Sequence, residues 1–256
     1  MTLRAAVFAS GGGSNLQALI DHFHKDRGRR EDGDAHSGSM VRIVLVVGDR
    51  STAGALERAE LAGIQARVIP VAGRAEQGVA TETVALLRTA KVDLVVLAGY
   101  LRRIPPDVVR AFRGRLLNIH PALLPAFGGK GMYGSHVHRA VIEAGCRVSG
   151  ATVHFVDEEY DRGPILAQWP VPVLPGDSAE QLAARVLRVE HILYPAAVEA
   201  LASRIASEQG IVAAGDEIRQ SSAGAAPPRG NGPSAFHLVK YGEPARGQIR
   251  RALGLE

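Results

Sequence analysis

Short runs of apolar residues alternate along this chain with stretches in which apolar positions recur every three or four residues. The first pattern is typical of buried strands and the second of helices packed on a sheet. We expect strands at Leu3–Ser10, Val41–Gly48, Ala66–Pro70, Asp93–Ala98 and Arg115–His120, and helices at Asn15–Phe23, Ala53–Leu61, Ala75–Ala90 and Pro105–Phe112. This order predicts an α/β chain with a Rossmann-like, doubly wound and mostly parallel sheet, because parallel strands need crossover helices.

The second half of the chain predicts three further features. Strands at Gly150–Val156 and Ile165–Val173 lie close together in sequence, so we expect antiparallel additions at the carboxyl side of the sheet. Ser178 and Gln181 have the spacing of a capping box, from which a long amphipathic helix should run to about Leu201. Glycines in and before Lys130–His138 predict a flap that can move.

The composition changes at Ala202, where Ala, Gly, Pro and Ser begin to dominate. We therefore expect one domain over residues 1–201 and a partly flexible C-terminal extension over 202–256. Ser221–Ser234 is the most linker-like part of that extension, and Ala235–Tyr241 carries apolar and aromatic residues that could tether it.

Composition excludes several classes of protein. The chain has 256 residues, 46% of them hydrophobic, which supplies a normal globular core. Its net charge of +4 comes from basic residues interleaved with acids, which favours small anionic ligands over nucleic acid. No apolar run approaches the roughly 20 residues that span a bilayer. The single cysteine, Cys146, and the absence of a signal peptide favour the cytoplasm, and a monomer or a homodimer both remain open.

Asn118 and His120 are the first candidates for chemistry. Period-two alternation puts both side chains on one side of an extended segment, near the carboxyl end of the fifth predicted strand. Open α/β sheets bind their ligands at that end. An amide beside a titratable imidazole suits a carbonyl oxygen that becomes an oxyanion during acyl transfer. Taken alone, the two residues could also simply end a strand and bond local backbone groups.

Ser10–Asn15 forms a glycine-rich turn between the first predicted strand and the first helix. Free backbone amides at such a helix start attract a phosphate group. The spacing lacks the third glycine of the dinucleotide fingerprint, so a mononucleotide phosphate is the better interpretation. A purely structural glycine turn is the alternative at this point.

The acidic and histidine clusters do not predict a metal site. Asp157, Glu158, Glu159 and Asp161 lack the alternating spacing of a calcium loop, and His136 with His138 has no acidic third ligand.

The segment Gly150–Pro164 provides a second motif, which together with the first points to one protein family. Together with Asn118-Ile119-His120-Pro121, it resembles the folate-dependent glycinamide ribonucleotide formyltransferases, and the resemblance runs in order from about Arg4 to Leu201. It implies transfer of a formyl group from 10-formyltetrahydrofolate, the cosubstrate, to the amine of glycinamide ribonucleotide, a step of purine biosynthesis. Small molecules would be the only partners, without a metal or a nicotinamide, and with neither a nucleic acid nor a membrane.

The resemblance also implies roles for individual residues. It assigns catalysis to Asn118, His120 and Asp161, with the Asp161 carboxylate holding His120 charged. The implied ribotide site is Gly13, Ser14, Asn15 and Glu190, and the implied folate site is Leu101, Arg102, Arg103, Ile104 and Asn118. Arg103 and Arg162 depart from the family pattern, which usually has an apolar residue at the first position and a small one at the second.

Three alternatives share parts of this pattern. Formyltetrahydrofolate hydrolases resemble the same core but carry a preceding regulatory domain and a different residue at the position of Pro121. Methionyl-tRNA formyltransferases add a larger, basic C-terminal domain than the tail after Leu201 provides. A non-catalytic nucleotide-binding module would bind ligand without formyl transfer.

Overall fold

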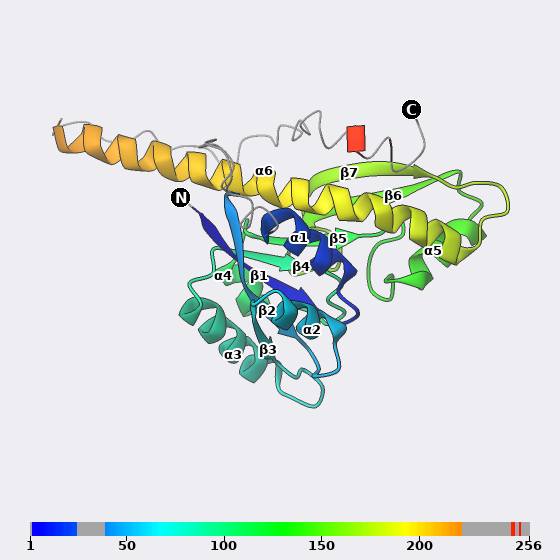
Figure 1. Cartoon of the computed structure of the whole chain (residues 1–256), viewed down its shortest axis with the longest axis horizontal. Coiled ribbons are helices and arrows are strands. Elements are labelled where there is room, and N and C mark those ends of the chain that lie inside the picture. Colours follow the sequence, from blue (N-terminus) through cyan, green and yellow to red (C-terminus); the bar gives the residue numbers. More distant parts are fainter. Residues whose placement is uncertain (1, 25–38, 222–246, 249–250, 252–256) are drawn as a thin grey trace.

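The computed structural model describes residues 2–24, 39–221, 247–248 and 251, with side chains described as far as Ser207 within the central range (Figure 1). Most of the predicted C-terminal extension, including Ala235–Tyr241, lies outside these residues, so its predicted flexibility and docking stay predictions. No helix within the described ranges is both long enough and apolar enough to cross a membrane.

Seven strands form one sheet in the order β3-β2-β1-β4-β5-β6-β7. They are β1 (Leu3–Ala9), β2 (Val41–Gly48), β3 (Gln65–Val68), β4 (Leu94–Leu97), β5 (Leu116–His120), β6 (Val148–Phe155) and β7 (Ile165–Pro172). The first five strands are parallel, whereas β6 and β7 pair antiparallel. The predicted mostly parallel, doubly wound sheet and its two antiparallel additions are confirmed.

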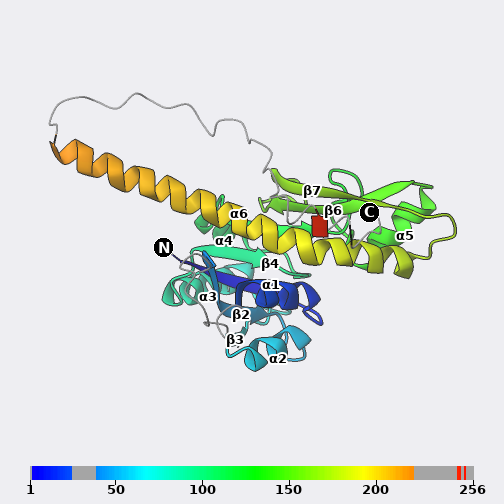
Figure 2. The same cartoon turned by 45° about the horizontal axis from the view of Figure 1, so that its top comes forward.

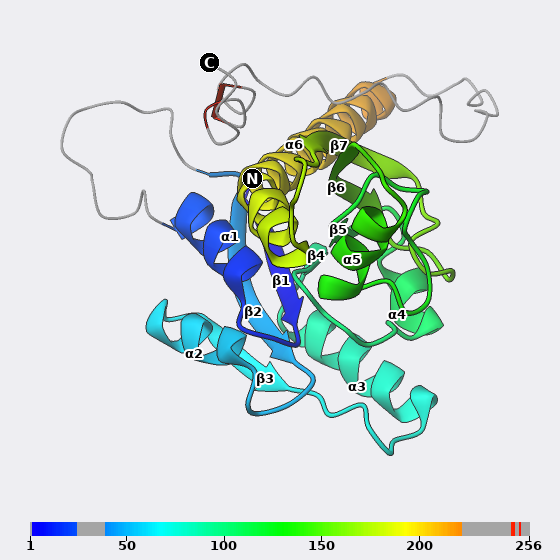
Figure 3. The same cartoon turned by 90° about the vertical axis from the view of Figure 1, so that its right-hand side faces the viewer.

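Helices cover both faces of the sheet (Figures 1 and 3). One face carries α1 (Ser14–His24), α2 (Gly54–Leu61), α5 (Ser135–Glu143) and α6 (Ala179–Ser221), and the other carries α3 (Glu76–Thr89) and α4 (Pro106–Ala111). Alternation along β1 shows the division: Ala5 and Val7 belong to the first apolar cluster, and Ala6 and Phe8 to the second. Each face of a parallel sheet is thus buried, as its continuous apolar strands require.

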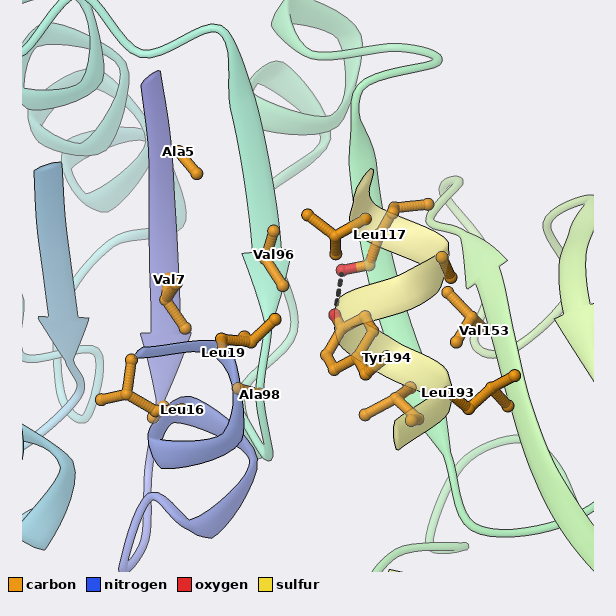
Figure 4. Packing of buried hydrophobic residues seen from close by; sticks show 14 of the residues in the cluster. Ala5, Val7, Leu16, Leu19, Val96, Ala98, Leu117, Val153, Leu193 and Tyr194 are labelled. Atoms are coloured by element: carbon orange, nitrogen blue, oxygen red, sulfur yellow. Dashed lines mark hydrogen bonds between the residues drawn. The ribbon is translucent and has the colours of Figure 1, made fainter. Parts of the chain in front are cut away.

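Helix α6 is anchored to the two strands that lead to the candidate site. The Tyr194 side chain is fully buried, and its hydroxyl proton is shared between the backbone oxygens of Leu97 at 2.9 Å and Leu117 at 3.2 Å. Figure 4 shows the second of these bonds. Leu97 ends β4 and Leu117 lies within β5. The hydroxyl therefore bridges the helix and both strands inside an otherwise apolar core, where a lost hydrogen bond is costly.

The predicted capping box at the start of α6 is confirmed. The Ser178 amide donates to Oε1 of Gln181 at 2.8 Å, and the Gln181 amide donates to Oγ of Ser178 at 3.2 Å. These reciprocal bonds satisfy backbone groups that the first helical turn leaves unpaired.

One sequence prediction about a helix was wrong, and one helix was not predicted. The helix expected to end near Leu201 continues to Ser221 and projects past the sheet (Figures 1 and 2). Ala, Glu, Gln and Arg after Leu201 are strong helix formers, so a composition that suggested a linker also supports a helix. Helix α5 was not predicted: it begins inside the predicted flap, because the glycines end at Gly134 and Val137 and Val141 then pack into the core. The movement of the flap stays a prediction.

Replacing Tyr194 by Phe should lower the free energy of unfolding by about 1–2 kcal/mol, because it removes the buried hydroxyl and the hydrogen bond that its proton shares between the two carbonyls. Urea denaturation measures the loss. Tyr160→Phe is the matched control, since that side chain is 47% exposed and should change stability little. Equal stability of wild type and Tyr194→Phe would show that the bridge contributes nothing.

Ending the chain after Ala206 should leave the fold intact, because Leu201, Ala202 and Ile205 all remain in the core. Ending it after Pro195 removes that apolar surface and should unfold the protein or lower its melting temperature by many degrees. Thermal unfolding of the two truncated chains tests the difference. A large loss of stability in the chain ending at Ala206 would instead reveal docking by the extension.

Candidate active site

A cavity of about 480 Å³ opens at the carboxyl ends of β4 and β5. The loop after β4, the end of β5, the loop after β6 and the inner face of α6 line it. All predicted catalytic and folate-binding residues contribute, and from the predicted ribotide site Asn15 and Glu190 do so: Asn15, Leu101, Arg102, Arg103, Ile104, Asn118, His120, Asp161 and Glu190. The topology therefore collects residues that are as many as 175 positions apart in sequence.

Asn118 and His120 point to the same side of β5, as their alternation predicted. Asn118 pairs across the antiparallel ladder with His154 of β6. Its Nδ2 lies 3.1 Å from Nε2 of His154, while Nδ1 of His154 lies 2.8 Å from the backbone oxygen of Phe155. With the His154 proton on Nδ1, Nε2 accepts one amide hydrogen and the second amide hydrogen of Asn118 remains for an oxygen in the cavity.

His154 lines the cavity and was missed by the sequence analysis. It is 2% exposed and lies between Asn118 and Asp161, with its Nε2 3.6 Å from Oδ1 of Asp161. A histidine inside an apolar strand was a weak signal by itself, and only the strand register shows which residue it faces.

Asp161 lies where the loop after β6 turns back toward β5. Its backbone has a φ of 55°, a left-handed conformation that Asp tolerates better than most residues. Oδ2 accepts the Gly129 amide at 2.9 Å and lies 3.7 Å from Nδ1 of His120. The Nε2 atom of His120 meanwhile lies 2.8 Å from the backbone oxygen of Phe127, which identifies Nε2 as the donor.

The expectation that Asp161 holds His120 charged was wrong for this structure. Burial lowers the pKa of His120 below its ordinary value, although the Asp161 charge and the hydrogen bond to Phe127 raise it. Burial wins because an imidazolium loses its hydration, while the nearest carboxylate oxygen is 3.7 Å away and beyond hydrogen-bond distance. His120 is therefore neutral at pH 7.

Asp161 behaves in the opposite way. Burial alone would raise its pKa, but the His154 side chain, the Gly129 amide and the proximity of His120 together outweigh that effect and lower the pKa. The site thus holds an ionised carboxylate beside a neutral imidazole. This pair can accept a proton, since the carboxylate stabilises the imidazolium that forms.

The glycine-rich turn Ser10–Asn15 is held in place by hydrogen bonds from α2. Gly11 and Gly12 use their carbonyls to accept the Ala55 amide at 3.1 Å and the Arg58 guanidinium at 2.7 Å. Gly13 has a φ of 75°, and a Cβ there would lie 2.8 Å from the Cα of Ala55. Glycine is therefore needed at this position for backbone conformation and for packing on α2, independently of any ligand.

Asn15 joins the turn to α6. Its Nδ2 donates to Oε2 of Glu190 at 2.8 Å, and Glu190 is 6% exposed. Burial raises the pKa of Glu190, against the opposing effect of the Asn15 hydrogen bond. Gly13 and Ser14 are not part of the cavity lining, and Ser14 borders a separate groove between α1 and α6. The structure thus brings only half of the predicted ribotide site into the cavity.

The predicted folate loop forms one wall of the cavity. Gly99, with a φ of 73°, turns the chain after β4, and the Leu101 amide then donates to Oγ of Ser10 at 2.9 Å. Leu101 is 51% exposed, so the loop presents an apolar side chain at the mouth. Arg103 lines the cavity while its Nη2 donates to the Glu158 backbone oxygen at 3.1 Å, which ties this loop to the one that carries Asp161.

The chain belongs to the formyl transferase family, which matches residues 3–198. Relatives named phosphoribosylglycinamide formyltransferase, chloroplastic, from Vigna unguiculata and Arabidopsis thaliana are 48% and 49% identical over 199 and 200 residues. These alignments cover 77% of this chain but only 60% and 65% of those proteins.

Bacterial proteins are similar over more of their own length. Phosphoribosylglycinamide formyltransferase of Escherichia coli is 38% identical over 194 residues, covering 75% of this chain and 84% of that protein. The crystal structure of the protein of that name from Brucella melitensis has a TM-score of 0.69 and 41% identity, covering 79% of this chain and 96% of that one. Family and fold thus agree with the geometry of the cavity.

His138 should make the fold sensitive to acid. It is 4% exposed, its Nδ1 has no hydrogen-bond partner among the described residues, and burial together with the neighbouring His120 lowers its pKa to about 4. As the pH falls from about 6.5 toward 4, His138 becomes protonated in the unfolded chain but stays neutral in the folded chain. The free energy of unfolding therefore does not depend on His138 above about pH 6.5 and decreases below it.

His138→Gln should therefore remove part of this acid destabilisation, roughly 2 kcal/mol after allowance for solvent screening. Urea denaturation at a series of pH values measures it, with His136→Gln as the exposed control on the same helix. Identical acid slopes for His138→Gln and wild type would contradict the assignment.

Proposed function

We propose that this protein transfers the formyl group of 10-formyltetrahydrofolate to the amine of glycinamide ribonucleotide, in the synthesis of purines. The observation that carries the proposal is the convergence of Asn118, His120 and Asp161 on one cavity. The names of the plant and bacterial relatives support the same reaction.

In this proposal the ribotide amine first attacks the formyl carbon of the donor and forms a bond to it. The bond between that carbon and the folate nitrogen then breaks. Asn118 directs its free amide hydrogen at the developing oxyanion. The pair His120 and Asp161 receives the proton of the attacking amine and returns a proton to the departing folate nitrogen. A neutral His120 suits this role, because it can accept the proton before the charged form stabilises the oxyanion.

The two substrates would occupy different walls of the cavity. Glu190 and Asn15 would provide a carboxyl group and an amide for the hydroxyl groups of the ribose. The turn at Gly13 and Ser14, which lies outside the cavity lining, would supply backbone amides for a phosphate that extends beyond the cavity. The loop Leu101–Ile104, together with Asn118, would hold the folate. Apolar side chains and backbone groups in this loop match a flat heterocycle with polar edges.

A hydrolase is the second candidate, because it would use the same donor and oxyanion donors with water as the nucleophile. A formyltetrahydrofolate deformylase from Pseudomonas syringae is similar in structure, with a TM-score of 0.68, although it is only 25% identical and 62% covered. The Asn15–Glu190 pair favours the transferase, since hydrolysis needs no ribose-binding groups.

Product analysis separates the two reactions. The protein is mixed with a 10-formyl folate, with and without glycinamide ribonucleotide, and release of the deformylated folate is followed together with formylation of the ribotide. Release that requires the ribotide and matches its formylation supports the transferase. Release at the same rate without ribotide would replace this proposal by the hydrolase.

His120→Ala and Asp161→Asn should each lower kcat by about 10²–10³ while changing the KM values much less, because both residues act on charge that develops during reaction. The double variant should be little worse than the worse single variant. Steady-state kinetics measure this, with the exposed His22→Ala as control. Losses that multiply would show that the two residues do not act as a pair.

We also propose a cytoplasmic location, supported by the single cysteine. Cys146 is free and partly buried, as a reducing compartment allows.

A further inference from the structure

Asp49 is a buried carboxylate next to the cavity but not in its lining. It directly follows β2, and its side chain is 1% exposed. Its Oδ1 is buried without a hydrogen-bond partner in the described part of the chain. A buried carboxylate with one unsatisfied oxygen costs stability, so its position at the edge of a ligand site needs an explanation beyond packing.

The best partner of Asp49 is Arg102 in the folate loop. Nε of Arg102 donates to Oδ2 of Asp49 at 2.7 Å, and this bond raises the pKa of the guanidinium further. This bond uses only Nε of the guanidinium, so the two terminal nitrogens, Nη1 and Nη2, remain available to a ligand. The Arg102 side chain is 44% exposed and lines the cavity. An arginine held through Nε presents a planar fork that matches a carboxylate.

Residues at the ends of neighbouring strands also bond to the start of the folate loop. In the sheet, β1 lies between β2, which leads to Asp49, and β4, which leads to Arg102. Arg50 donates to the Ser10 backbone oxygen through Nε at 3.0 Å and Nη2 at 2.6 Å, and its Nε lies 3.6 Å from Oδ1 of Asp49. Ser10 in turn accepts the Leu101 amide at 2.9 Å. Three strand ends therefore converge on the first residues of the folate loop.

We propose that Asp49 is a positioning residue that orients the Arg102 guanidinium toward a carboxylate of the formyl donor, and so sets the affinity for that cosubstrate. This proposal rests on the proposed function for the identity of the donor. Asp49 touches no substrate itself. Its effect should appear in donor binding and not in the chemical step, because Arg102 belongs to the loop wall and not to the group around Asn118 and His120.

Asp49→Ala removes the acceptor of the Arg102 Nε bond and should raise the KM for the formyl donor about ten-fold, with kcat and the KM for the ribotide within about two-fold. Asp49→Asn retains an oxygen that Nε can bond, so it should restore most of the donor affinity. Arg102 is half-exposed, and therefore neither variant leaves a buried, unpaired cation.

A double-variant cycle tests whether Asp49 acts through Arg102. Arg102→Ala should weaken donor binding on its own, and Asp49→Ala in that background should cause no further loss. Asp177→Ala is the matched control, because Asp177 is also a buried acid paired with an arginine, Arg185, at 2.5 Å, but outside the cavity lining. It should lower the melting temperature and leave the donor KM unchanged.

Calorimetric binding of a stable 10-formyl folate analogue, measured without ribotide, separates this proposal from the proposed function. The proposal that Asp49 positions Arg102 predicts three results: Asp49→Ala binds the analogue more weakly, Asp49→Asn regains most of the affinity, and the double variant loses no more than Arg102→Ala. These results would support it even if the wild type transferred no formyl group. Unchanged binding by Asp49→Ala, or a loss that simply adds to that of Arg102→Ala, would overturn it. A wild-type protein that binds no formyl folate would overturn both proposals.

Discussion

The antiparallel pairing of β5 with β6 is the constraint on which the candidate active site depends. Its register places Asn118 opposite His154 and His120 opposite Thr152. Thr152 is fully buried and bonds the Ala122 backbone oxygen at 2.6 Å, which fixes the chain just after His120. A slip of one residue would turn every side chain of β6 to the other face of the sheet and break these contacts together. Backbone pairing, more than any single side chain, therefore positions Asn118 and His120.

Burial determines the charge of the groups in the cavity. His120 and Glu190 are both driven toward their neutral forms, and the hydrogen bond or neighbouring charge that opposes this is not enough to reverse it. Asp161 resists the same effect because a backbone amide and two imidazoles surround it. Two acids of similar intrinsic strength thus have pKa values shifted in opposite directions, because Asp161 has more favourable neighbours than Glu190 and is less completely buried. A resting site with a neutral imidazole beside an ionised carboxylate is ready to accept a proton.

Contacts between loops connect the cavity wall formed by Leu101–Ile104 to the wall that carries Asp161. Arg103 bonds the backbone of Glu158, and Glu158 also pairs with Arg113 at 2.6 Å. On the opposite side, Ser10, Arg50 and Asp49 hold the start of the same loop. The loop that lines the cavity is therefore bonded at both ends, and movement at one wall must displace groups that touch the other. Such support is what keeps a binding site close to its working geometry.

Local patterns in the sequence determined most of the fold, because apolar periodicity and turn residues act within a few positions. They predicted the strands and most helices to within two residues at their ends, and alternation alone placed Asn118 and His120 on one side of a strand. The roles of Asp161 and Glu190 came only from a family resemblance. Tertiary structure decided the partner of Asn118, the neutral state of His120, the burial of Glu190 and the contact of Asp49 with Arg102. Each of these depends on residues far apart in sequence and on the loss of water around them, and neither is encoded in a local pattern.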